Sequence, residues 1–345
     1  MLNRQLVIWG PRKLSLIESE VPELGNSEVL VRVRASAICT WEQRTFKGDQ
    51  TDSYPLLGGH ELSGEVLALG PGVKERIQVG GKVAVARLTR CGECYNCRTG
   101  KDNICLNARS DKVAGHPFGP GGLSEYIVAP AYQIYPFQND PSFEVAALSE
   151  PLSCVVRSVR KAGVDFGQNV VIMGGGVMGI LHTILTVKRG AMVLVSEPLP
   201  HRREKALEYG AKVVVNPLEE DVVSLTRKLT RGVGADAVFV TGGGAKAVEQ
   251  AIDICAKGGT VIIYGAMYPS PKVTIDTNRI HHNEITITGS MSQTKEDFLL
   301  ATRLIDSGAI DLNPLISATV PFVGIEEAFE KAIDPSNYRI VVTMP

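Results

Sequence analysis

The glycine-rich stretch Gly174-Gly-Gly-Val-Met-Gly179 constrains the fold of this 345-residue chain more than any other feature. It follows Val170–Met173, an apolar run typical of a buried strand, and it precedes Ile180–Val187, which predicts a helix. Glycines spaced G-x-G-x-x-G at a strand-to-helix turn form a dinucleotide-binding fingerprint. The first glycine permits the tight turn, the second lets the backbone approach a pyrophosphate, and the third allows close helix packing.

A carboxylate follows this motif at the position that a dinucleotide site requires. Glu197 ends the next predicted strand, 18 residues after Gly179, where it would hold the adenosine ribose. It would also repel a 2′-phosphate, which favours NAD over NADP, although His201, Arg202 and Arg203 would partly reverse that preference. A plain glycine-rich turn is the alternative. The expected cofactor contacts are Gly174, Gly176, Val177, Met178, Gly179, Glu197, Arg202 and Thr241.

The pattern of predicted elements changes near residue 150. Before it, short β-rich runs such as Glu28–Arg34, Gly64–Leu69 and Lys82–Ala86 are separated by Gly and Pro turns, as in an antiparallel barrel or sandwich. After it, apolar strands alternate with helical stretches, which indicates a parallel α/β sheet. The expected strands are Asn169–Met173, Met192–Ser196, Lys212–Val215, Ala237–Val240 and Thr260–Tyr264.

The last part of the chain is expected to leave that sheet. From Asn283 onward, the segment Glu284–Ser290 and the predicted helices Lys295–Ser307 and Ile325–Ile333 suggest a return to the first domain. A chain of this length with 44% hydrophobic residues can bury a large core and divide into two domains.

Composition excludes several classes of partner. The formal net charge of −1 provides no basic surface for nucleic acid, and no run approaches the roughly 20 apolar residues of a membrane span. The N-terminal segment MLNRQLVIWGPRKL lacks a signal-peptide pattern. We therefore expect a cytoplasmic protein with reduced thiols.

Four of the seven cysteines lie in residues 91–105, with the spacing C-x2-C-x2-C-x7-C. Thiolates this close can surround one ion tetrahedrally, so the segment predicts a closed structural zinc lobe. An iron–sulfur cluster uses similar spacing and is the alternative, whereas a disulfide framework is typical of small secreted proteins. Cys154 and Cys255 lie among apolar residues, where we expect them to pack rather than bind metal. The expected ligands are Cys91, Cys94, Cys97 and Cys105.

A second set of potential ligands is spread over the chain. Together, Cys39, His60, Glu61 and Glu150 offer one thiolate, one imidazole and two carboxylates, a set that suits a zinc site with an open position. Taken singly, each has a structural explanation. A cysteine can be a small buried hydrophobe, a histidine can be satisfied in the core, and a carboxylate can begin a helix.

The order of these motifs resembles the zinc-dependent medium-chain alcohol dehydrogenases, and most closely their sorbitol, butanediol and threonine dehydrogenase branch. The matching motifs are Cys39, Gly59–Val66, the four-cysteine segment, Gly121–Tyr126, Ser149–Ser153 and the glycine-rich turn. The resemblance covers essentially the whole chain. It implies zinc-assisted oxidation of a secondary alcohol to a ketone, or the reverse reaction.

The same resemblance implies a domain organisation and an assembly. Residues 1–152 and 286–345 would form a GroES-like catalytic domain that carries the zinc lobe at 91–105. Residues 153–285 would form a Rossmann NAD-binding domain. The fold class is therefore α/β, a β-rich domain beside a doubly wound parallel sheet, and the family implies a homodimer or homotetramer.

The resemblance also implies roles for individual residues. Cys39 and His60 would bind the catalytic zinc, with Glu61 or Glu150 as the third protein ligand. Glu42 stands where the family usually has an aspartate that supports the zinc-binding histidine, and a surface salt bridge is the alternative role. With the structural site, each chain would bind two zinc ions.

One position departs from the family pattern. The family places Ser or Thr two residues after the zinc cysteine to take the proton from the alcohol, and here that residue is Trp41. Arg44 stands where a histidine of the same relay is often found. Three alternatives remain open: proton loss through zinc-bound water and Glu150, a shifted relay through Thr40 or Thr45, or little activity on simple alcohols.

These observations predict an oxidoreductase that transfers a hydride between NAD and a secondary alcohol. The expected substrate is a polyol, a cyclitol or a sugar-derived alcohol, since Arg44 could hydrogen-bond a hydroxyl-rich or anionic molecule. An L-threonine or 2,3-butanediol dehydrogenase is the alternative. An NAD-binding protein with little or no alcohol turnover is the alternative from another class. We expect neither nucleic acid nor a membrane as a partner.

Overall fold

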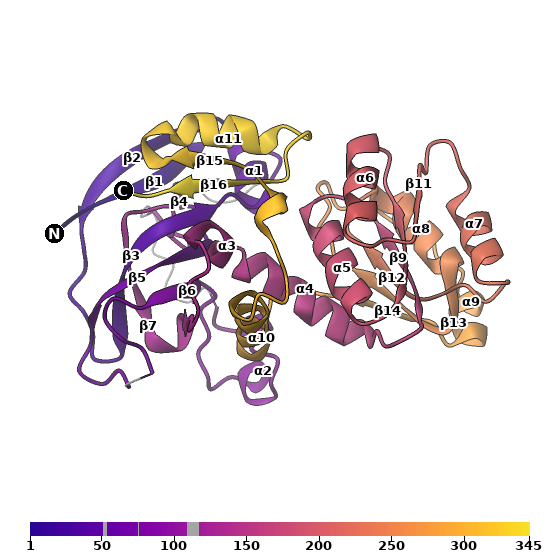
Figure 1. Cartoon of the computed structure of the whole chain (residues 1–345), viewed down its shortest axis with the longest axis horizontal. Helices are drawn as coiled ribbons and strands as arrows, with labels where there is room; N and C mark the ends of the chain where they lie inside the picture. The colour runs from indigo at the N-terminus through magenta and orange to yellow at the C-terminus, as the bar shows by residue number, and fades with distance from the viewer. Residues whose placement is uncertain (51–53, 75, 109–116) are drawn as a thin grey trace. The chain divides into compact units, whose positions relative to one another are not determined.

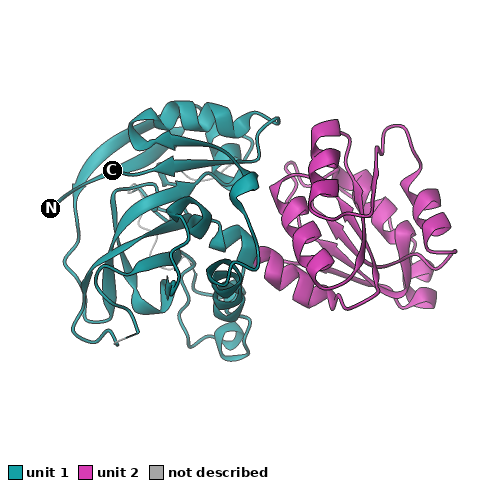
Figure 2. Cartoon of the chain, viewed as in Figure 1, with its two compact units in different colours: residues 1–153, 292–345 teal, residues 154–291 magenta. Residues whose placement is uncertain are grey.

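The chain divides into two compact units, which Figure 2 shows in separate colours. Our computed structural model describes residues 1–50, 54–74, 76–108 and 117–345. Unit 1 comprises residues 1–153 and 292–345, and unit 2 comprises residues 154–291. Among the described residues, no helix is long and apolar enough to cross a membrane. The expected fold class, a β-rich part combined with a parallel α/β sheet, is confirmed.

Unit 1 contains two β-sheets (Figure 1). The larger has seven strands in the order β15-β16-β3-β5-β6-β8, with β7 also paired to β3, and the smaller has the order β2-β1-β4. Neighbouring strands are antiparallel except β15 and β16, which are parallel. The strands are β1 (Leu2–Gly10), β2 (Lys13–Glu20), β3 (Glu28–Ala37), β4 (Leu56–Leu57), β5 (Glu61–Leu69), β6 (Lys82–Ala86), β7 (Tyr126–Pro130), β8 (Ile134–Pro136), β15 (Ile316–Pro321) and β16 (Arg339–Thr343).

The helices of unit 1 lie between its strands in the sequence. The α-helices are α1 (Thr40–Lys47), α2 (Tyr95–Arg98), α3 (Phe143–Ala147), α10 (Lys295–Asp306) and α11 (Ile325–Ile333). Short 3-10 helices are Asp102–Ile104, Ala131–Gln133, Asn313–Leu315 and Phe322–Gly324. Helix α4 (Ser149–Ala162) begins in unit 1 and continues into unit 2.

The register of the larger sheet gathers the ends of three strands. Strand β3 ends at Ala37, which pairs with Glu61 at the start of β5, and Glu61 pairs with Ala86 at the end of β6. Along Glu28–Arg34 of β3, buried valines alternate with partly exposed residues, three of which are charged, as expected for a strand with one core face. This register places Cys39 and His60, which lie just beyond these paired ends, at one edge of the sheet.

Unit 2 is a six-stranded parallel sheet in the order β11-β10-β9-β12-β13-β14. Figure 1 shows α5 and α6 on one side of its strands and α7, α8 and α9 on the other. This is the strand order of a dinucleotide-binding fold, whose ligand lies where the order reverses, next to β9. The elements are β9 (Asn169–Met173), α5 (Val177–Lys188), β10 (Met192–Ser196), α6 (Pro200–Glu208), β11 (Val213–Val215), α7 (Val222–Leu229), β12 (Ala235–Val240), α8 (Gly244–Ile254), β13 (Cys255–Ile263), α9 (Thr277–Asn283) and β14 (Thr286–Gly289).

The interpretation of the segment after Asn283 as the start of the return to the first domain was wrong. Thr286–Gly289 forms β14, the sixth strand of the sheet, and pairs in parallel with β13. Its alternation of threonine and isoleucine is typical of an edge strand, which differs from the continuous apolar runs of the central strands. The chain enters unit 1 again only at residue 292.

Candidate metal centres and cofactor site

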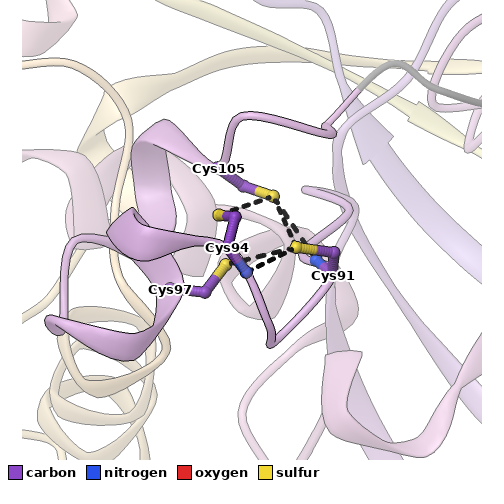
Figure 3. Close-up of side chains that lie close together, drawn as sticks. All are labelled: Cys91, Cys94, Cys97 and Cys105. Carbon is purple, nitrogen blue, oxygen red and sulfur yellow. Dashed lines mark hydrogen bonds between the residues drawn. The ribbon is translucent and has the colours of Figure 1, made fainter.

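The four clustered cysteines point their sulfur atoms toward one another (Figure 3). The Sγ–Sγ distances are 3.5 Å between Cys91 and Cys105, 3.9 Å between Cys94 and Cys105, and 4.0 Å between Cys91 and Cys97. Tetrahedral zinc with Zn–S bonds of about 2.3 Å requires sulfurs about 3.8 Å apart. The set fits a single zinc ion, whereas an iron–sulfur cluster would need its cysteines farther apart to enclose several iron atoms.

Backbone amides already favour thiolates in this lobe. The N–H of Cys94 donates to Cys91 Sγ over 3.3 Å, and the N–H groups of Cys91 and Asn107 each donate to Cys105 Sγ over 3.4 Å. Backbone N–H donors also lower the pKa of Cys94 to about 6. Zinc binds the thiolate form of cysteine, so these amides prepare Cys91 and Cys94 for the metal, whereas burial raises the pKa of Cys97 to about 12.

A buried ion pair joins the lobe to the rest of unit 1. Arg90, which precedes the first cysteine, lies 3.4 Å from the Asp102 carboxylate and donates over 2.8 Å to the carbonyl of Gln293. Lys295, at the start of α10, lies 3.7 Å from the same carboxylate. The lobe is therefore tied to the segment that returns from unit 2.

Helix α1 begins at the second candidate metal centre. Cys39 is its N-cap residue, and the Glu42 side chain accepts a hydrogen bond from the Cys39 N–H over 3.2 Å. The other oxygen of the Glu42 carboxylate accepts from the Gly59 N–H over 2.9 Å and contacts His60 Nδ1 at 2.8 Å. Glu42 is fully buried, which leaves no surface role for it. One carboxylate therefore links the segments that carry Cys39 and His60.

The contact with Glu42 defines how His60 can act. With Nδ1 held by a carboxylate, the ring nitrogen that remains for a metal is Nε2. Burial alone would lower the pKa of His60, but Glu42 and Cys39 outweigh it and raise this pKa well above the usual value. Such a partner raises the basicity of a histidine ligand.

Glu61 adds a buried carboxylate beside His60 and meets a residue that the sequence analysis missed. Arg339, the first residue of β16, lies with Nη2 2.9 Å from Glu61 Oε1, and both side chains are almost completely buried. Neither Glu61 oxygen accepts a well-aligned hydrogen bond from the described residues. Burial raises the pKa of Glu61 to about 7, although Arg339 acts to lower it.

Glu150 completes the set from the first turn of α4. One ligand atom each from His60, Glu61 and Glu150 lie within 4.8 Å of one another, and the same holds for Cys39, Glu42 and His60. The two buried oxygens of Glu61, which accept no aligned hydrogen bond from the described residues, are suited to a cation. The donor set of one sulfur, one nitrogen and carboxylate oxygens fits zinc.

The residues that depart from the family's usual proton relay, Trp41 and Arg44, both lie in helix α1. The rings of Trp41 and His60 meet edge to face, with their centroids 5.8 Å apart. Thr45 is buried and donates its hydroxyl to the carbonyl of Trp41 over 3.0 Å, whereas Thr40 is exposed. Arg44 lies in the last turn of α1, three residues after Trp41. Of the two threonines, Thr40 is therefore the one with a solvent-accessible hydroxyl.

The glycine-rich turn of unit 2 has the backbone geometry of a pyrophosphate site. Gly174 has φ 108°, a value that favours glycine, and a Cβ on Gly179 would lie 1.8 Å from the Gly174 carbonyl oxygen. Gly176 is the N-cap of α5, which begins with Val177 and Met178. Thr241, just after β12, donates to the carbonyl of Met173 over 2.9 Å. The N-terminus of α5 therefore faces the switch point of the sheet.

Glu197 lies directly against this turn. Its carboxylate accepts hydrogen bonds from the Gly175 N–H over 2.6 Å and from the Leu199 N–H over 2.9 Å. Arg203 donates to the carbonyls of Glu197 and Pro198. Arg202 Nη1 lies 3.6 Å from the position that a Cβ on Gly176 would occupy, so its guanidinium also borders the turn.

The two remaining cysteines lie outside these centres. Cys255 is buried, and burial raises its pKa to about 11. Cys154 is partly exposed and follows the unit boundary in α4. Among the described residues, neither belongs to a group of side chains that could hold a metal ion.

Comparison with known proteins identifies the class. Residues 25–139 match the alcohol dehydrogenase GroES-like domain, and residues 177–307 match the zinc-binding dehydrogenase family. The chain is 38% identical over 323 residues to the L-threonine 3-dehydrogenase of Pyrococcus horikoshii, which covers 91% of this chain and 90% of that protein. It is 33% identical over 322 residues to the 2-dehydro-3-deoxy-L-galactonate 5-dehydrogenase of Pseudoalteromonas atlantica, with coverage of 93% and 92%.

Solved structures of zinc-binding dehydrogenases have the same fold as this chain. A crystal structure described as a zinc-binding dehydrogenase from Sinorhizobium meliloti bound to NADP superposes with a TM-score of 0.90 at 28% identity, covering 99% of both chains. The chain belongs to the zinc-dependent medium-chain dehydrogenase family. It is accordingly an oxidoreductase that transfers a hydride between a nicotinamide cofactor and an alcohol.

Proposed function

We propose that this protein is an NAD-linked, zinc-dependent dehydrogenase of a polyol-like or sugar-derived secondary alcohol that carries an anionic group. The observation that carries the proposal is the convergence of Cys39, His60, Glu61 and Glu150, with Glu42 bonded to both the cysteine and histidine segments. No purely structural role accounts for a thiol, an imidazole and two buried carboxylates at one edge of a sheet.

The chain's own residues have distinct roles in this proposal. Cys39 and His60 hold the metal, and Glu61 or Glu150 supplies the third protein ligand. Zinc, when bound, polarises the alcohol or ketone oxygen as a Lewis acid. Glu42 fixes the ring of His60, and Arg339 partly offsets the charge of Glu61. Four further cysteines hold the structural zinc.

Proton removal has two candidate routes. The Thr45 hydroxyl is buried and bonded within α1, which argues against a relay through it. Thr40 is exposed at the first helical position, beside Cys39, and Glu150 lies among the metal ligands. We propose that the proton leaves through Thr40 or Glu150, because Trp41 fills the usual relay position against His60.

The substrate class rests on chemistry shared by the relatives' names. L-threonine and 2-dehydro-3-deoxy-L-galactonate both carry a carboxylate and a secondary alcohol. Arg44 and the other guanidinium groups of unit 1 suit such an anion better than a simple alcohol. L-threonine itself is the second candidate, favoured by the 38% identity to the Pyrococcus horikoshii enzyme.

The choice of cofactor rests on Glu197. Its carboxylate lies against the glycine-rich turn, where it would bind the ribose hydroxyls of NAD and repel the 2′-phosphate of NADP. The Sinorhizobium meliloti structure contains NADP, so a related chain accommodates the 2′-phosphate. Arg202, beside Gly176, is the residue that would favour the phosphate.

The test is reduction of NAD and NADP by the zinc-loaded protein with a panel of substrates. The panel contains sugar acids, polyols, cyclitols, L-threonine, 2,3-butanediol and ethanol, with Cys39→Ala as the control. We expect turnover of one substrate class with NAD and its loss in the control. Ethanol as the best substrate would contradict the proposal, and no turnover with two zinc ions bound would favour a cofactor-binding role without alcohol oxidation.

We also propose a homodimer or homotetramer located in the cytoplasm. The edge strand β14 supports association, because an edge strand offers unpaired backbone groups to a second copy. None of the seven cysteines, all within the described residues, forms a disulfide, which supports a reducing compartment. Light scattering on the purified protein measures its oligomeric state.

A further inference from the structure

We propose that Trp41 selects the substrate by donating its indole N–H to a second oxygen atom near the reacting alcohol. The enzyme would then favour diols, polyols and hydroxy acids over simple secondary alcohols. This inference rests on the proposed function, since it assigns a specificity-determining residue to the same site. Three features of Trp41 carry it: the position of its ring, the lack of an acceptor for its N–H, and the contacts that hold the ring.

The first feature is that the Trp41 ring lies beside a proposed metal ligand. Trp41 is the second residue of α1, between the N-cap Cys39 and Glu42. Its ring meets that of His60 edge to face, with an interplanar angle of 67° and centroids 5.8 Å apart. Nδ1 of His60 faces Glu42, and the His60 side chain is 22% exposed. A substrate that binds a metal held by the other ring nitrogen of His60 is therefore within reach of the indole.

The second feature is that the indole N–H of Trp41 has no acceptor among the described residues. The nitrogen is not fully buried, so a ligand can reach it. The other tryptophan of the chain, Trp9, donates its N–H to the Ser15 hydroxyl over 2.9 Å. Because a tryptophan in contact with a core usually finds such a partner, we infer that a ligand oxygen supplies the acceptor for Trp41.

The third feature is that other contacts hold the indole in place. The Trp41 ring packs against the hydrophobic core cluster of unit 1, which includes Ile38 and Phe46. The carbonyl of Trp41 accepts a hydrogen bond from the buried Thr45 hydroxyl over 3.0 Å. A side chain that is already held loses little conformational freedom when it binds a ligand. The N–H is therefore available without rearrangement of the helix.

The chemistry of indole decides what Trp41 can recognise. Its N–H is a donor only and carries no charge, so it binds an oxygen acceptor such as a hydroxyl, carboxylate or phosphate group. A substrate with such an oxygen near the reacting carbon satisfies this donor. A simple secondary alcohol instead places an apolar chain against it, which leaves the donor without a partner and weakens binding.

The experiment compares substrates in matched pairs that differ in one oxygen-bearing group. The pairs are 2,3-butanediol with 2-butanol, trans-1,2-cyclohexanediol with cyclohexanol, 3-hydroxybutanoate with 2-pentanol, and the best substrate of the panel with its deoxy analogue. Trp41→Phe removes the N–H but keeps an aromatic ring. Trp9→Phe, on the exposed part of β1, is the matched control. Zinc content and thermal unfolding are measured for each variant to establish that it is folded.

We expect Trp41→Phe to lower kcat/KM for the diols about three- to tenfold more than for the simple alcohols, the loss expected for one hydrogen bond between neutral groups. The loss should occur mainly in KM, because the bond forms when the substrate binds. It should be larger for 3-hydroxybutanoate, since a hydrogen bond to a carboxylate is stronger. Trp9→Phe should retain the wild-type preference in every pair.

Fluorescence provides a readout that does not depend on turnover. In the Trp9→Phe protein, Trp41 is the one remaining tryptophan, so the emission reports on this site. The zinc-loaded protein without cofactor is titrated with each member of the pairs. We expect a saturable change of emission with the diols and with 3-hydroxybutanoate at concentrations where the simple alcohols have no effect. Calorimetry of the same compounds should show weaker binding to Trp41→Phe than to wild type.

Two results would overturn the inference. Unchanged kinetics in Trp41→Phe, or an equal loss for both members of each pair, would show that the N–H does not select the substrate. If neither the pairs nor the panel is turned over, the proposed function fails, and the binding measurements then decide separately. In that case, a saturable change with the oxygen-bearing members supports the role of Trp41, and the absence of any change refutes it.

Discussion

Glu42 shows how much of a metal centre a single carboxylate can organise. It accepts hydrogen bonds from the Cys39 and Gly59 amides and contacts His60 Nδ1, and none of its surface is exposed. The two segments that carry the proposed ligands Cys39 and His60 are thereby linked through one side chain. The side chain of glutamate is one methylene longer than that of aspartate. This length lets Glu42 reach from the first turn of α1 to the residues before β5.

Glu42→Gln should weaken zinc at the catalytic centre while the structural zinc stays bound. Loss of a carboxylate behind a histidine ligand typically costs about 10- to 100-fold in metal affinity. Competition with a chromogenic chelator measures the two zinc ions separately. Glu18→Gln, on the exposed part of β2, is the matched control. Unchanged affinity at the catalytic centre would show that Glu42 holds the helix and not the ligand.

The sequence predicted Glu42 as a support for His60 but could not predict Arg339 beside Glu61. Cys39, His60, Glu61 and Glu150 stand in motifs with recognisable spacing. Arg339 is 278 positions after Glu61 and meets it only because β16 pairs with β3. Such a contact depends on strand pairing between distant segments, which periodicity along the chain does not contain.

At the scale of elements, the zinc lobe is a small module with its own ligands and its own anchor. Arg90 and Asp102 join it to the segment around Gln293, and backbone N–H groups point at its sulfurs. The lobe contains only short helical turns, α2 and a 3-10 helix, and its exposed side chains include Tyr95 and Leu106. With so little core of its own, it depends on the metal for its conformation.

Cys94→Ser should reduce bound zinc from about two ions to about one per chain, because a closed site needs all four thiolates. Limited proteolysis should then cut within residues 91–105, where the wild type resists. Cys255→Ser, which changes a buried cysteine in unit 2, is the control and should keep both ions. Two ions retained in Cys94→Ser would disprove the four-cysteine site.

A buried histidine joins two helices of unit 2. His182 on α5 contacts the carbonyl of Met178 and the Ser158 hydroxyl of α4, over 2.7 Å and 2.9 Å, and packs against Phe239 and Tyr264. Burial lowers its pKa to about 4. Between that value and the ordinary pKa of about 6.5, the unfolded chain binds a proton that the folded chain does not.

This difference in proton binding at His182 predicts that acid lowers the stability of the folded chain. The His182 contribution to the free energy of unfolding should fall by about 2 kcal/mol between pH 7 and pH 5, with no change above pH 7. Urea unfolding followed by circular dichroism measures it as the difference between wild type and His182→Gln, whose unfolding should depend less on pH in this window. His201→Gln, an exposed histidine of α6, should behave like the wild type. Parallel pH profiles of wild type and His182→Gln would refute the assignment.

The strands of unit 2 show where sequence patterns were sufficient to predict an element and where they were not. Strands β9, β10 and β12 contain continuous apolar runs and were expected within two residues of their positions, whereas β13 begins at Cys255, before the expected Thr260. Strand β14 was missed as part of the sheet because an edge strand alternates between polar and apolar residues and resembles a strand of either domain. Its membership is decided by pairing with β13, which the sequence does not encode locally.

At the scale of the whole molecule, the chain builds unit 1 from two separate segments. Residues 1–153 supply most of its strands, and residues 292–345 add β15 and β16 to the same sheet. Unit 2 is a single continuous segment with its own core, which includes Val171, Val238 and Val261. Each unit thus has the internal packing of a domain.

Arg339, the first residue of β16, follows the whole of unit 2 in the sequence, and this order affects how the protein folds during synthesis. During synthesis, residues 154–291 can fold as soon as they leave the ribosome, whereas the sheet of unit 1 must wait for β16. Until Arg339 arrives, the Glu61 carboxylate lacks its partner. Strand β16, which follows unit 2 in the sequence, therefore completes the candidate metal centre, so a ribosome that stops before this strand releases a chain with a folded cofactor domain and an incomplete candidate metal site.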